Sequence, residues 1–281
     1  MAFDLKYSYD YCKKIAVSHY ENFPVASLLI PSEKRKYIFA VYAFARIADD
    51  IADEGSELFE KRIAELTLYK NDFIQRSNVE NYLHFPAVYD TIEKYNLSEI
   101  LFTNLIEAFI QDNEKFEYQN FAEVLEYCKK SANPVGRIVL QIFDHHDQEM
   151  FRLSDLICTA LQLTNFWQDL SIDLRKGRCY LPQDEMQQNQ ITFNELKNTD
   201  LSPALKELLK IQIDRTGEMF DEGQKLILHL KGLLKLEIKL TILGGKSILR
   251  KIKKLDYNIL LRRPKLNILN KIFLFIKMLF V

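Results

Sequence analysis

Apolar residues recur at helical spacing along most of this 281-residue chain, and few glycines or prolines interrupt them. The longest such run follows Pro31: Ser32 is the expected N-cap, and no helix breaker occurs from Lys34 until Gly55. Because apolar residues fill most of this run, we expect much of the helix to be buried inside a bundle. Further helices are predicted at residues 5–20, 57–76, 87–95, 97–113, 121–130, 134–145, 152–174, 202–231 and 233–255.

Two segments depart from this pattern. Residues 181–199 are polar and weakly periodic, which predicts an ordered surface loop with a short helical turn. After Pro264 apolar residues dominate again, and the polar positions fall within about 120° of a helical wheel: Asn267, Asn270, Lys271 and Lys277. The pattern predicts one helical domain over residues 1–263 and an amphipathic tail over residues 264–281. The sequence contains neither a long linker nor an internal repeat.

The composition favours an all-α fold. Hydrophobic residues make up 48% of the chain, enough to bury a sizeable core, and the chain contains only 8 glycines and 7 prolines. The four cysteines are widely separated and form no CxxC pair, so neither a zinc site nor a disulfide framework is indicated. We interpret the cysteines as reduced packing residues of a single-domain helical bundle.

Charge is distributed unevenly along the chain, although the formal net charge is only −1. From Lys225 onward there are 14 basic and 2 acidic residues, a net charge of +12, whereas residues 1–224 carry a net charge of −13. The basic region merges with the amphipathic tail, and Lys271 and Lys277 interrupt that tail too early for a membrane span. We predict that the tail lies in the interface of an anionic membrane; packing as a core helix of the bundle is the alternative.

The same features bear on location and partners. The N-terminus is acidic and aromatic, unlike a secretory signal, so the expected location is the cytoplasm, with peripheral attachment to the cytoplasmic face of the inner membrane. Nucleic acid is not an expected partner. The residues between the basic positions are leucine, isoleucine and phenylalanine, whereas a nucleic-acid site would have aromatic residues that stack on bases from a polar sheet. The sequence does not specify an oligomeric state.

Two pairs of aspartates stand four residues apart in largely apolar helices: Asp49 with Asp53, and Asp169 with Asp173. This spacing places both carboxylates of a pair on one helix face, one turn apart, where like charges repel. A divalent cation offsets that repulsion, and Mg²⁺ binds one or two carboxylates together with water and phosphate oxygens. The pairs therefore predict a cluster of about two or three Mg²⁺ ions that binds diphosphate, with Asp50 as a further ligand. Ordinary solvated helix faces are the alternative.

Basic residues accompany both pairs. Arg46 lies three residues before Asp49 and hence on the same helix face, so it is a candidate diphosphate ligand; a simple surface ion pair is the alternative. Lys176, Arg178 and Arg262 are similar candidates. Gly177 has the character of a helix C-terminal cap, and basic residues are also typical of a helix end.

These residues resemble the squalene and phytoene synthase family of head-to-head prenyl synthases. The two aspartate-rich motifs of that family match residues 49–53 (DDIAD, after YAFAR) and residues 165–173 (NFWQDLSID). Residues 127–137 (YCKKSANPVGR) match the helix-kinking segment that lines the family's pocket. The resemblance extends from about His19 to Arg263. It implies an isoprenoid (prenyl) synthase fold in which the two motifs face each other across a central cavity.

Within this family, several details most resemble the bacterial hydroxysqualene synthases of the hopanoid pathway: HYENFPVAS at 19–27, ADDIADEG at 48–55, SANPVG at 131–136 and NFWQD at 165–169. Such an enzyme ionises presqualene diphosphate with Mg²⁺, and water captures the rearranged carbocation. The family's second motif often has arginine where this chain has Gln168, which also favours this subgroup. Condensation of two prenyl diphosphates to presqualene diphosphate, dehydrosqualene or phytoene is the main alternative. NADPH is not an expected cofactor, because no GxGxxG motif occurs.

Pattern and resemblance together assign candidate site residues. Asp49, Asp53, Asp169 and Asp173 are the expected catalytic residues, acting as metal ligands with Asp50. The expected substrate-binding residues line an apolar cavity or contact the diphosphate: Phe23, Tyr42, Arg46, Tyr127, Ala132, Val135, Leu161, Asn165, Gln168, Lys176, Arg178 and Arg262. Core packing is the alternative for each aromatic side chain and for Asn165. A protein of a different class, a non-catalytic helical membrane-binding protein, is the remaining alternative.

Overall fold

The computed structural model describes residues 4–18, 29–53, 58–197, 201–267, 270, 273–275 and 277–278. The regular structure of these residues is helical, which confirms the predicted all-α class; within these ranges the extended pairing is confined to an isolated bridge between Glu117 and Cys179. Close contacts group the chain into two compact units. Unit 1 comprises residues 1–114 and 134–151, and unit 2 comprises residues 115–133 and 152–281.

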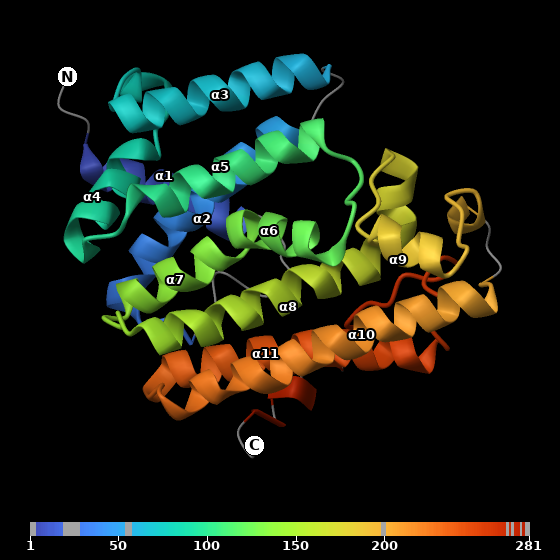
Figure 1. Ribbon diagram of the computed structural model, residues 1–281. Helices are drawn as coiled ribbons and strands as arrows, with labels where there is room; N and C mark the ends of the chain where they lie inside the picture. The colour runs from blue at the N-terminus through green and yellow to red at the C-terminus, as the bar shows by residue number, and fades with distance from the viewer. Residues whose placement is uncertain are drawn as a thin grey trace. The chain divides into compact units, whose positions relative to one another are not determined.

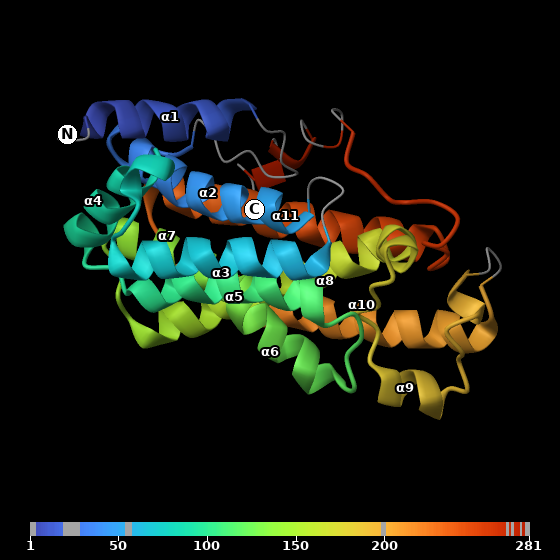
Figure 2. The same cartoon turned by 90° about the horizontal axis from the view of Figure 1, so that it is seen from above.

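Unit 1 is organised around one long apolar helix. Its helices are α1 (Leu5–Ser18), α2 (Ser32–Asp53), α3 (Phe59–Gln75), α4 (Phe85–Tyr95), α5 (Glu99–Glu114) and most of α7 (Asn133–Ile142). Helix α2 packs against α1, α3, α4 and α5, and Figure 2 shows α1 running along it. The fully buried ring of Phe44 lies 4.8–6.3 Å, between centroids, from those of Tyr69, Phe73, Phe85 and Phe102. This aromatic cluster explains why the apolar run of α2 is buried.

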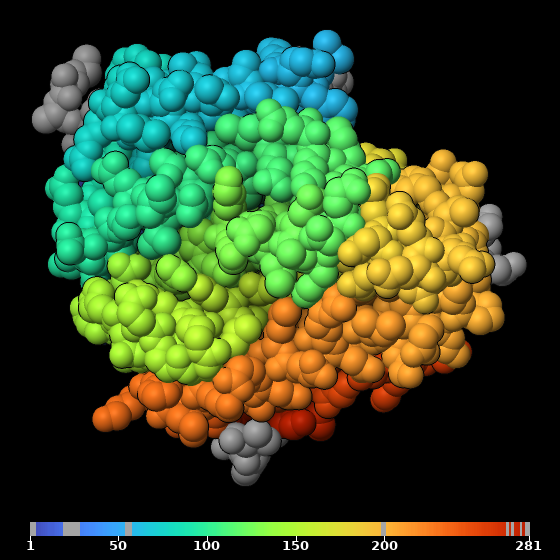
Figure 3. Space-filling view, viewed as in Figure 1, coloured from blue at the N-terminus to red at the C-terminus, as the bar shows by residue number. Residues whose placement is uncertain are grey.

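Unit 2 contains α6 (Phe121–Ser131), most of α8 (Gln148–Asp173), α9 (Gln183–Gln188), α10 (Pro203–Gly223) and α11 (Gly232–Lys254) (Figure 1). Helices α10 and α11 pack together where the Phe220 ring lies over Gly245, so closely that a Cβ atom at Gly245 would overlap the ring. Fully buried Trp167 of α8 donates from Nε1 to Thr216 Oγ1 of α10 at 2.9 Å. Helix α9 also contacts α10, and Figure 3 shows their surfaces as adjoining yellow and orange areas.

The start of α2 differs from the prediction by one residue. The carbonyl of Pro31 accepts hydrogen bonds from the backbone N–H groups of Lys34 and Arg35, at 3.0 Å each. The helix therefore begins at Ser32, and the prediction of Ser32 as the N-cap is wrong, because Pro31 already supplies the first helical acceptor.

The helix predicted at residues 202–231 is also shorter than expected. It ends at Gly223 and continues as a 3₁₀ turn (Gln224–Leu228). A Cβ atom at Gly223 would lie 2.8 Å from Ile157 Cγ1 of α8, so this position requires glycine for close packing. The end of α10 thus coincides with its contact with α8 at Gly223. Helical periodicity does not reveal such a tertiary contact.

Other boundaries follow local hydrogen bonding. Helix α8 begins at Gln148, earlier than the predicted residue 152, because Asp147 Oδ1 accepts from the backbone N–H of Met150 at 3.0 Å as an N-cap does. The segment 181–199 contains α9 and a 3₁₀ turn (Glu195–Lys197), in agreement with the predicted loop with a short helical turn. The helical chain is interrupted at Ala132, between α6 and α7, where the helix-kinking segment was predicted.

The C-terminal tail has one buried side. Among its described residues, Leu274 and Met278 are buried, whereas Phe273 and Phe275 are 63% and 46% exposed. Buried residues four positions apart are typical of the predicted amphipathic helix. Of the helices in the described ranges, none combines the length and the apolar character that crossing a membrane requires. Binding of the tail to a membrane interface stays a prediction, as does a domain boundary at residue 263.

The four cysteines are free thiols, and Cys12, Cys128 and Cys179 are buried. Burial raises the pKa of Cys12 and Cys128 to about 12 and that of Cys179 to about 11. These thiols are therefore protonated and unreactive at neutral pH, which agrees with their interpretation as packing residues.

Candidate functional site

The first pair of predicted carboxylates lies within the last five residues of α2, which ends at Asp53. Arg46 Nη1 is 3.1 Å from Asp49 Oδ2, and Arg46 Nη2 contacts Asp50. Burial lowers the pKa of Arg46, but the attraction of Asp49 and Asp50 outweighs burial and raises the pKa above its ordinary value. The surface ion pair considered as an alternative therefore forms. It also holds a permanently charged guanidinium beside the carboxylates.

A buried hydrogen-bond chain supports α2 next to Arg46. The hydroxyl of Tyr69 donates to the carbonyl of Phe44 at 3.2 Å and lies 2.6 Å from Nε2 of His84. Because the hydroxyl has one proton, we infer that His84 Nε2 donates to it. His84 is 1% exposed, and burial lowers its pKa to about 3, so the imidazole is neutral at physiological pH.

The second pair of carboxylates lies at the end of α8. Asp173 is the last residue of this helix, and a 3₁₀ turn (Leu174–Lys176) follows it. Gly177 has a φ of 80°, its N–H donates to the Leu174 carbonyl at 3.1 Å, and the N–H of Arg178 donates to the Asp173 carbonyl at 2.9 Å. These two hydrogen bonds form a Schellman motif and confirm Gly177 as the C-terminal cap.

Successive residues of the NFWQD segment in α8 contact different parts of unit 2. The ring of Phe166 stacks on Tyr180, with centroids 3.7 Å apart and planes inclined by 5°, while Trp167 bonds to α10. Gln168 is 2% exposed, and its Nε2 donates to the carbonyl of Pro264 at 2.9 Å. The helix is therefore packed on several sides, which explains its nearly continuous apolar sequence.

Arg263, which the sequence analysis did not single out, pairs with Asp169. Its Nη2 donates to Asp169 Oδ2 at 2.9 Å, and its Nε donates to Oδ1. Consecutive residues of α8 thus hold consecutive residues of the segment after α11, since Gln168 holds Pro264. The run Arg262-Arg263-Pro264 was the available signal, but local sequence does not show which arginine reaches the aspartate. The predicted Arg262 is exposed instead.

Aromatic side chains form a cluster around Phe166 of α8. Tyr127 is 4% exposed, and its ring lies 5.9 Å from those of Phe166 and Tyr118 and 6.0 Å from that of Tyr180. Packed rings of this kind present polarisable faces that stabilise cations, but their close mutual packing is also what a core requires. The cluster places the predicted Tyr127 in the same unit as Asp169.

Both carboxylate pairs suit a divalent cation for an electrostatic reason. Each lies within the last five residues of a long helix, where the helix dipole already carries partial negative charge, while Arg46 and Arg263 offset part of the charge of Asp49 and Asp169. In the described part of the chain, no three His, Cys, Asp or Glu side chains gather as a protein-only metal site would require. Mg²⁺ does not need such a cage, because one or two carboxylates and phosphate oxygens are enough.

The remaining predicted substrate-binding residues belong to both units. In unit 1, Tyr42 is half-buried and Val135 is 40% exposed. In unit 2, Ala132 is the C-cap of α6. On α8, Leu161 is half-buried and Asn165 is exposed. Lys176 is also exposed, whereas Arg178 is buried, with 9% of its surface exposed. Phe23 lies outside the described residues. That the two carboxylate pairs face each other across a cavity stays a prediction.

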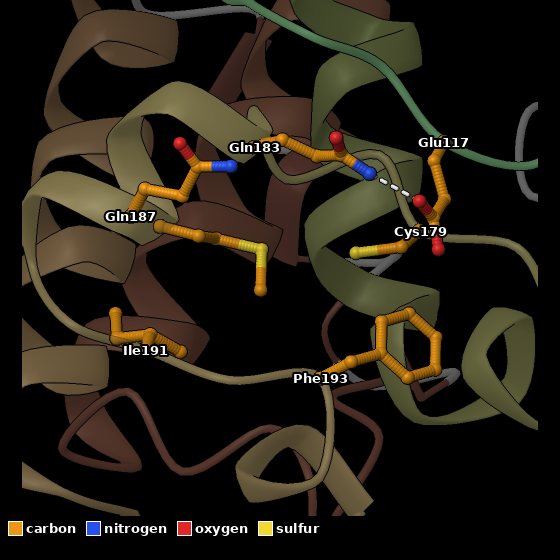
Figure 4. A pocket seen from close by; sticks show the side chains of 7 residues that line it. Glu117, Cys179, Gln183, Gln187, Ile191 and Phe193 are labelled. Atoms are coloured by element: carbon orange, nitrogen blue, oxygen red, sulfur yellow. Dashed lines mark hydrogen bonds between the residues drawn. The ribbon is translucent and has the colours of Figure 1, made fainter.

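A small pocket of about 200 Å³ in unit 2 contains none of the predicted site residues (Figure 4). Its lining includes Cys179, Glu117 and Gln183, and the Gln183 side-chain amide donates to Glu117 while its oxygen accepts from Gln119 at 2.9 Å. The polar groups of Gln183 are therefore used within the protein, and the Cys179 thiol is protonated at neutral pH.

Comparisons with known proteins point to one family. A family profile described as squalene/phytoene synthase matches residues 16–270. Hydroxysqualene synthase of Zymomonas mobilis is 33% identical over 202 residues, which cover 71% of this chain and 67% of that protein. The chloroplastic phytoene synthase 1 of Arabidopsis thaliana is 26% identical over 273 residues, 94% of this chain; the chain spans only 64% of that protein's length.

A solved structure agrees with these matches. The crystal structure of squalene synthase HpnC from Alicyclobacillus acidocaldarius superposes with a TM-score of 0.83 and 36% sequence identity. The match covers 90% of this chain and 96% of that chain.

Proposed function

The chain belongs to the squalene/phytoene synthase family, and we propose that it is a Mg²⁺-dependent enzyme that converts presqualene diphosphate to hydroxysqualene. One observation carries the proposal: two long helices, α2 and α8, each end in carboxylates four residues apart. Two carboxylates on one helix face can bind a divalent cation, and the diphosphate of a prenyl substrate would complete the coordination of Mg²⁺.

The proposed reaction breaks the bond between carbon and the diphosphate oxygen. Bound Mg²⁺ would neutralise the charge that develops on the diphosphate as it leaves. Asp49, Asp53, Asp169 and Asp173 would hold the metal ions, with Asp50 as a further ligand. Arg46, fixed by Asp49 and Asp50, would donate hydrogen bonds to a diphosphate oxygen. Apolar and aromatic residues would exclude water until the rearranged carbocation is captured.

Gln168 in the second motif supports the subgroup assignment by resemblance, and positive charge reaches the motif from another segment of the chain. Where related motifs often have arginine, this chain has Gln168, whose amide is bonded to Pro264. Arg263 supplies a guanidinium to Asp169 from a different segment. We infer that Arg263 takes over the electrostatic role of the missing arginine while leaving a neutral side chain within the motif.

Condensation of two prenyl diphosphates is the second candidate activity. The observation that favours it is the match to a phytoene synthase over 94% of this chain. Both activities would use the same metal ligands, so the two are distinguished by the substrate that the protein converts. Purified protein with Mg²⁺ should be incubated separately with farnesyl diphosphate and with presqualene diphosphate, and products identified by mass spectrometry. Hydroxysqualene from presqualene diphosphate is expected; a new carbon–carbon bond from farnesyl diphosphate alone would favour condensation.

Substitution of the carboxylates tests the metal site itself. Asp49→Asn and Asp169→Asn should each reduce Mg²⁺-dependent diphosphate release at least a hundredfold, in the range found when an electrostatic catalytic group is removed. If both carboxylates act on one diphosphate, the double variant should lose little more than either single variant. Asp221→Asn, at a helical aspartate that pairs with Lys246, is the matched control and should retain activity. Intact release in the first two variants would favour the non-catalytic alternative.

A further inference from the structure

A basic pocket of about 450 Å³ lies in unit 2 between the end of α11 and the segment that follows it. Five of its lining residues are cationic, and none is acidic: Lys251, Lys254, Arg262, Arg263 and Lys265, together with Leu255, Pro264 and Asn267. One wall is held in place from behind, because Gln168 bonds to the Pro264 carbonyl and Asp169 bonds to Arg263. The wall formed by residues 263–264 is therefore held in a fixed position.

Four of these cations lack an acidic partner among the described residues: Lys251, Lys254, Arg262 and Lys265. Neighbouring lysines do have partners, since Lys253 Nζ lies 2.6 Å from Asp214 Oδ1 and Lys206 Nζ lies 2.6 Å from Asp256 Oδ2. Lys251 and Lys254 share one face of α11, where like charges repel. A bound anion would relieve this repulsion through charge-assisted hydrogen bonds.

An exposed apolar side chain adjoins the pocket along the chain, because Leu261, next to Arg262, is 62% exposed. The tail carries further exposed apolar side chains, since Phe273 and Phe275 are 63% and 46% exposed. Exposed apolar side chains beside unpaired cations are the combination by which a protein binds the interface of an anionic membrane. A surface for single-stranded nucleic acid would instead present aromatic rings among the basic residues, and the lining of this pocket has none.

We propose that the basic pocket binds the phosphate headgroup of an anionic phospholipid and docks unit 2 on a membrane surface. Lysine ammonium groups and the Arg262 guanidinium supply donors to the phosphate, and Leu261 contacts the acyl boundary. The proposal extends the proposed function, because a membrane would receive an insoluble hydrocarbon product. Lipid binding itself does not require that reaction.

Vesicle flotation without substrate or Mg²⁺ separates this proposal from the proposed function. Wild-type protein should float with vesicles of phosphatidylglycerol and phosphatidylcholine, but not with phosphatidylcholine alone. The double variant Lys251→Gln/Lys254→Gln should bind the anionic vesicles about 30-fold more weakly, as expected for loss of two lysines near an anionic surface. Lys235→Gln/Lys239→Gln removes the same charge from the same helix outside the pocket, and should weaken binding less than threefold.

Three outcomes would overturn the proposal. The first is wild-type binding by the pocket variant, and the second is equal loss in the two double variants, which would indicate attraction to the whole basic region. The third is release of the wild-type protein from vesicles by millimolar inorganic diphosphate but not by equal ionic strength of chloride, which would make the pocket a diphosphate site. None of these outcomes depends on whether the protein turns over presqualene diphosphate.

Discussion

Arg263 donates hydrogen bonds to both carboxylate oxygens of Asp169, although the two residues are 94 positions apart in the chain. The pair is partly exposed, with 31% of the arginine side chain and 25% of the aspartate side chain accessible to solvent. This contact links the predicted metal ligand on α8 to the wall of the basic pocket. The charge of Asp169 is therefore balanced in the protein before any metal or substrate binds.

Replacement of Arg263 by glutamine should lower the free energy of unfolding by about 1–2 kcal/mol, because a two-pronged, partly buried ion pair is lost. Arg263→Lys should recover only part of this loss, since an ammonium group lacks the planar fork. Arg262→Gln changes the adjacent, exposed arginine and should alter stability by less than about 0.5 kcal/mol. Urea denaturation measures all three, and equal effects at residues 262 and 263 would contradict this account.

Magnesium and inorganic diphosphate together should stabilise the protein. Ligand at about a hundred times its dissociation constant contributes about 2.7 kcal/mol, which corresponds to a rise of roughly 5 °C in the unfolding temperature. Asp53→Asn or Asp173→Asn should reduce this rise by more than half, because each removes a proposed metal ligand. Differential scanning fluorimetry provides the measurement, with Asp221→Asn as the variant that should keep the full shift. A full shift in all variants would exclude these carboxylates as ligands.

The contact between Gly245 and Phe220 should make α11 intolerant of a side chain at this position. Gly245→Val would push the Phe220 ring out of its packed position and should destabilise the protein by about 1–3 kcal/mol. Gly217 also lies inside a helix, but a Cβ atom there would meet no atom within 4 Å. Gly217→Ala should therefore raise stability by up to about 1 kcal/mol through helix propensity. Thermal unfolding measures both variants. A change in unfolding temperature of the same sign for Gly245→Val and Gly217→Ala would contradict this packing.

Burial of His84 should make stability depend on pH. Burial lowers its pKa to about 3 in the folded protein, whereas an unfolded histidine titrates near pH 6.5. Between these values the unfolded chain binds a proton that the folded chain does not, so stability falls as the pH falls through this window. The expected slope is about 1.4 kcal/mol per pH unit.

His84→Gln should abolish this slope, so the stability difference between wild type and variant should shrink by about 1.4 kcal/mol per pH unit as the pH falls below 6.5. The variant should also be less stable than wild type at pH 7.5. Denaturant midpoints measured from pH 4.5 to 7.5 test it. His229→Gln, at an exposed histidine, should leave the wild-type slope unchanged. An unaltered slope in His84→Gln would show that the buried imidazole is not the group responsible.

Helix existence could be predicted from the sequence because it depends on local periodicity, whereas the prenyl-synthase type of fold was predicted from the resemblance of the motifs to a known family. The apolar spacing after Pro31 and the cap at Gly177 appear in the structure within a residue or two, and the predicted prenyl-synthase type of fold is confirmed by the match to a solved squalene synthase at 36% identity. The four-residue spacing of Asp49 and Asp53 likewise sets both on one helix face without reference to the rest of the chain.

Contacts between distant segments were decided by the tertiary structure alone. Periodicity does not show that Arg263, and not Arg262, reaches Asp169, because that choice depends on where the segment after α11 is held by Gln168. It also does not show that Gly223 and Gly245 are packing sites, because the atoms that fill the space beside them belong to α8 and α10. Local sequence determines which residues share a helix face, and long-range packing determines what that face meets.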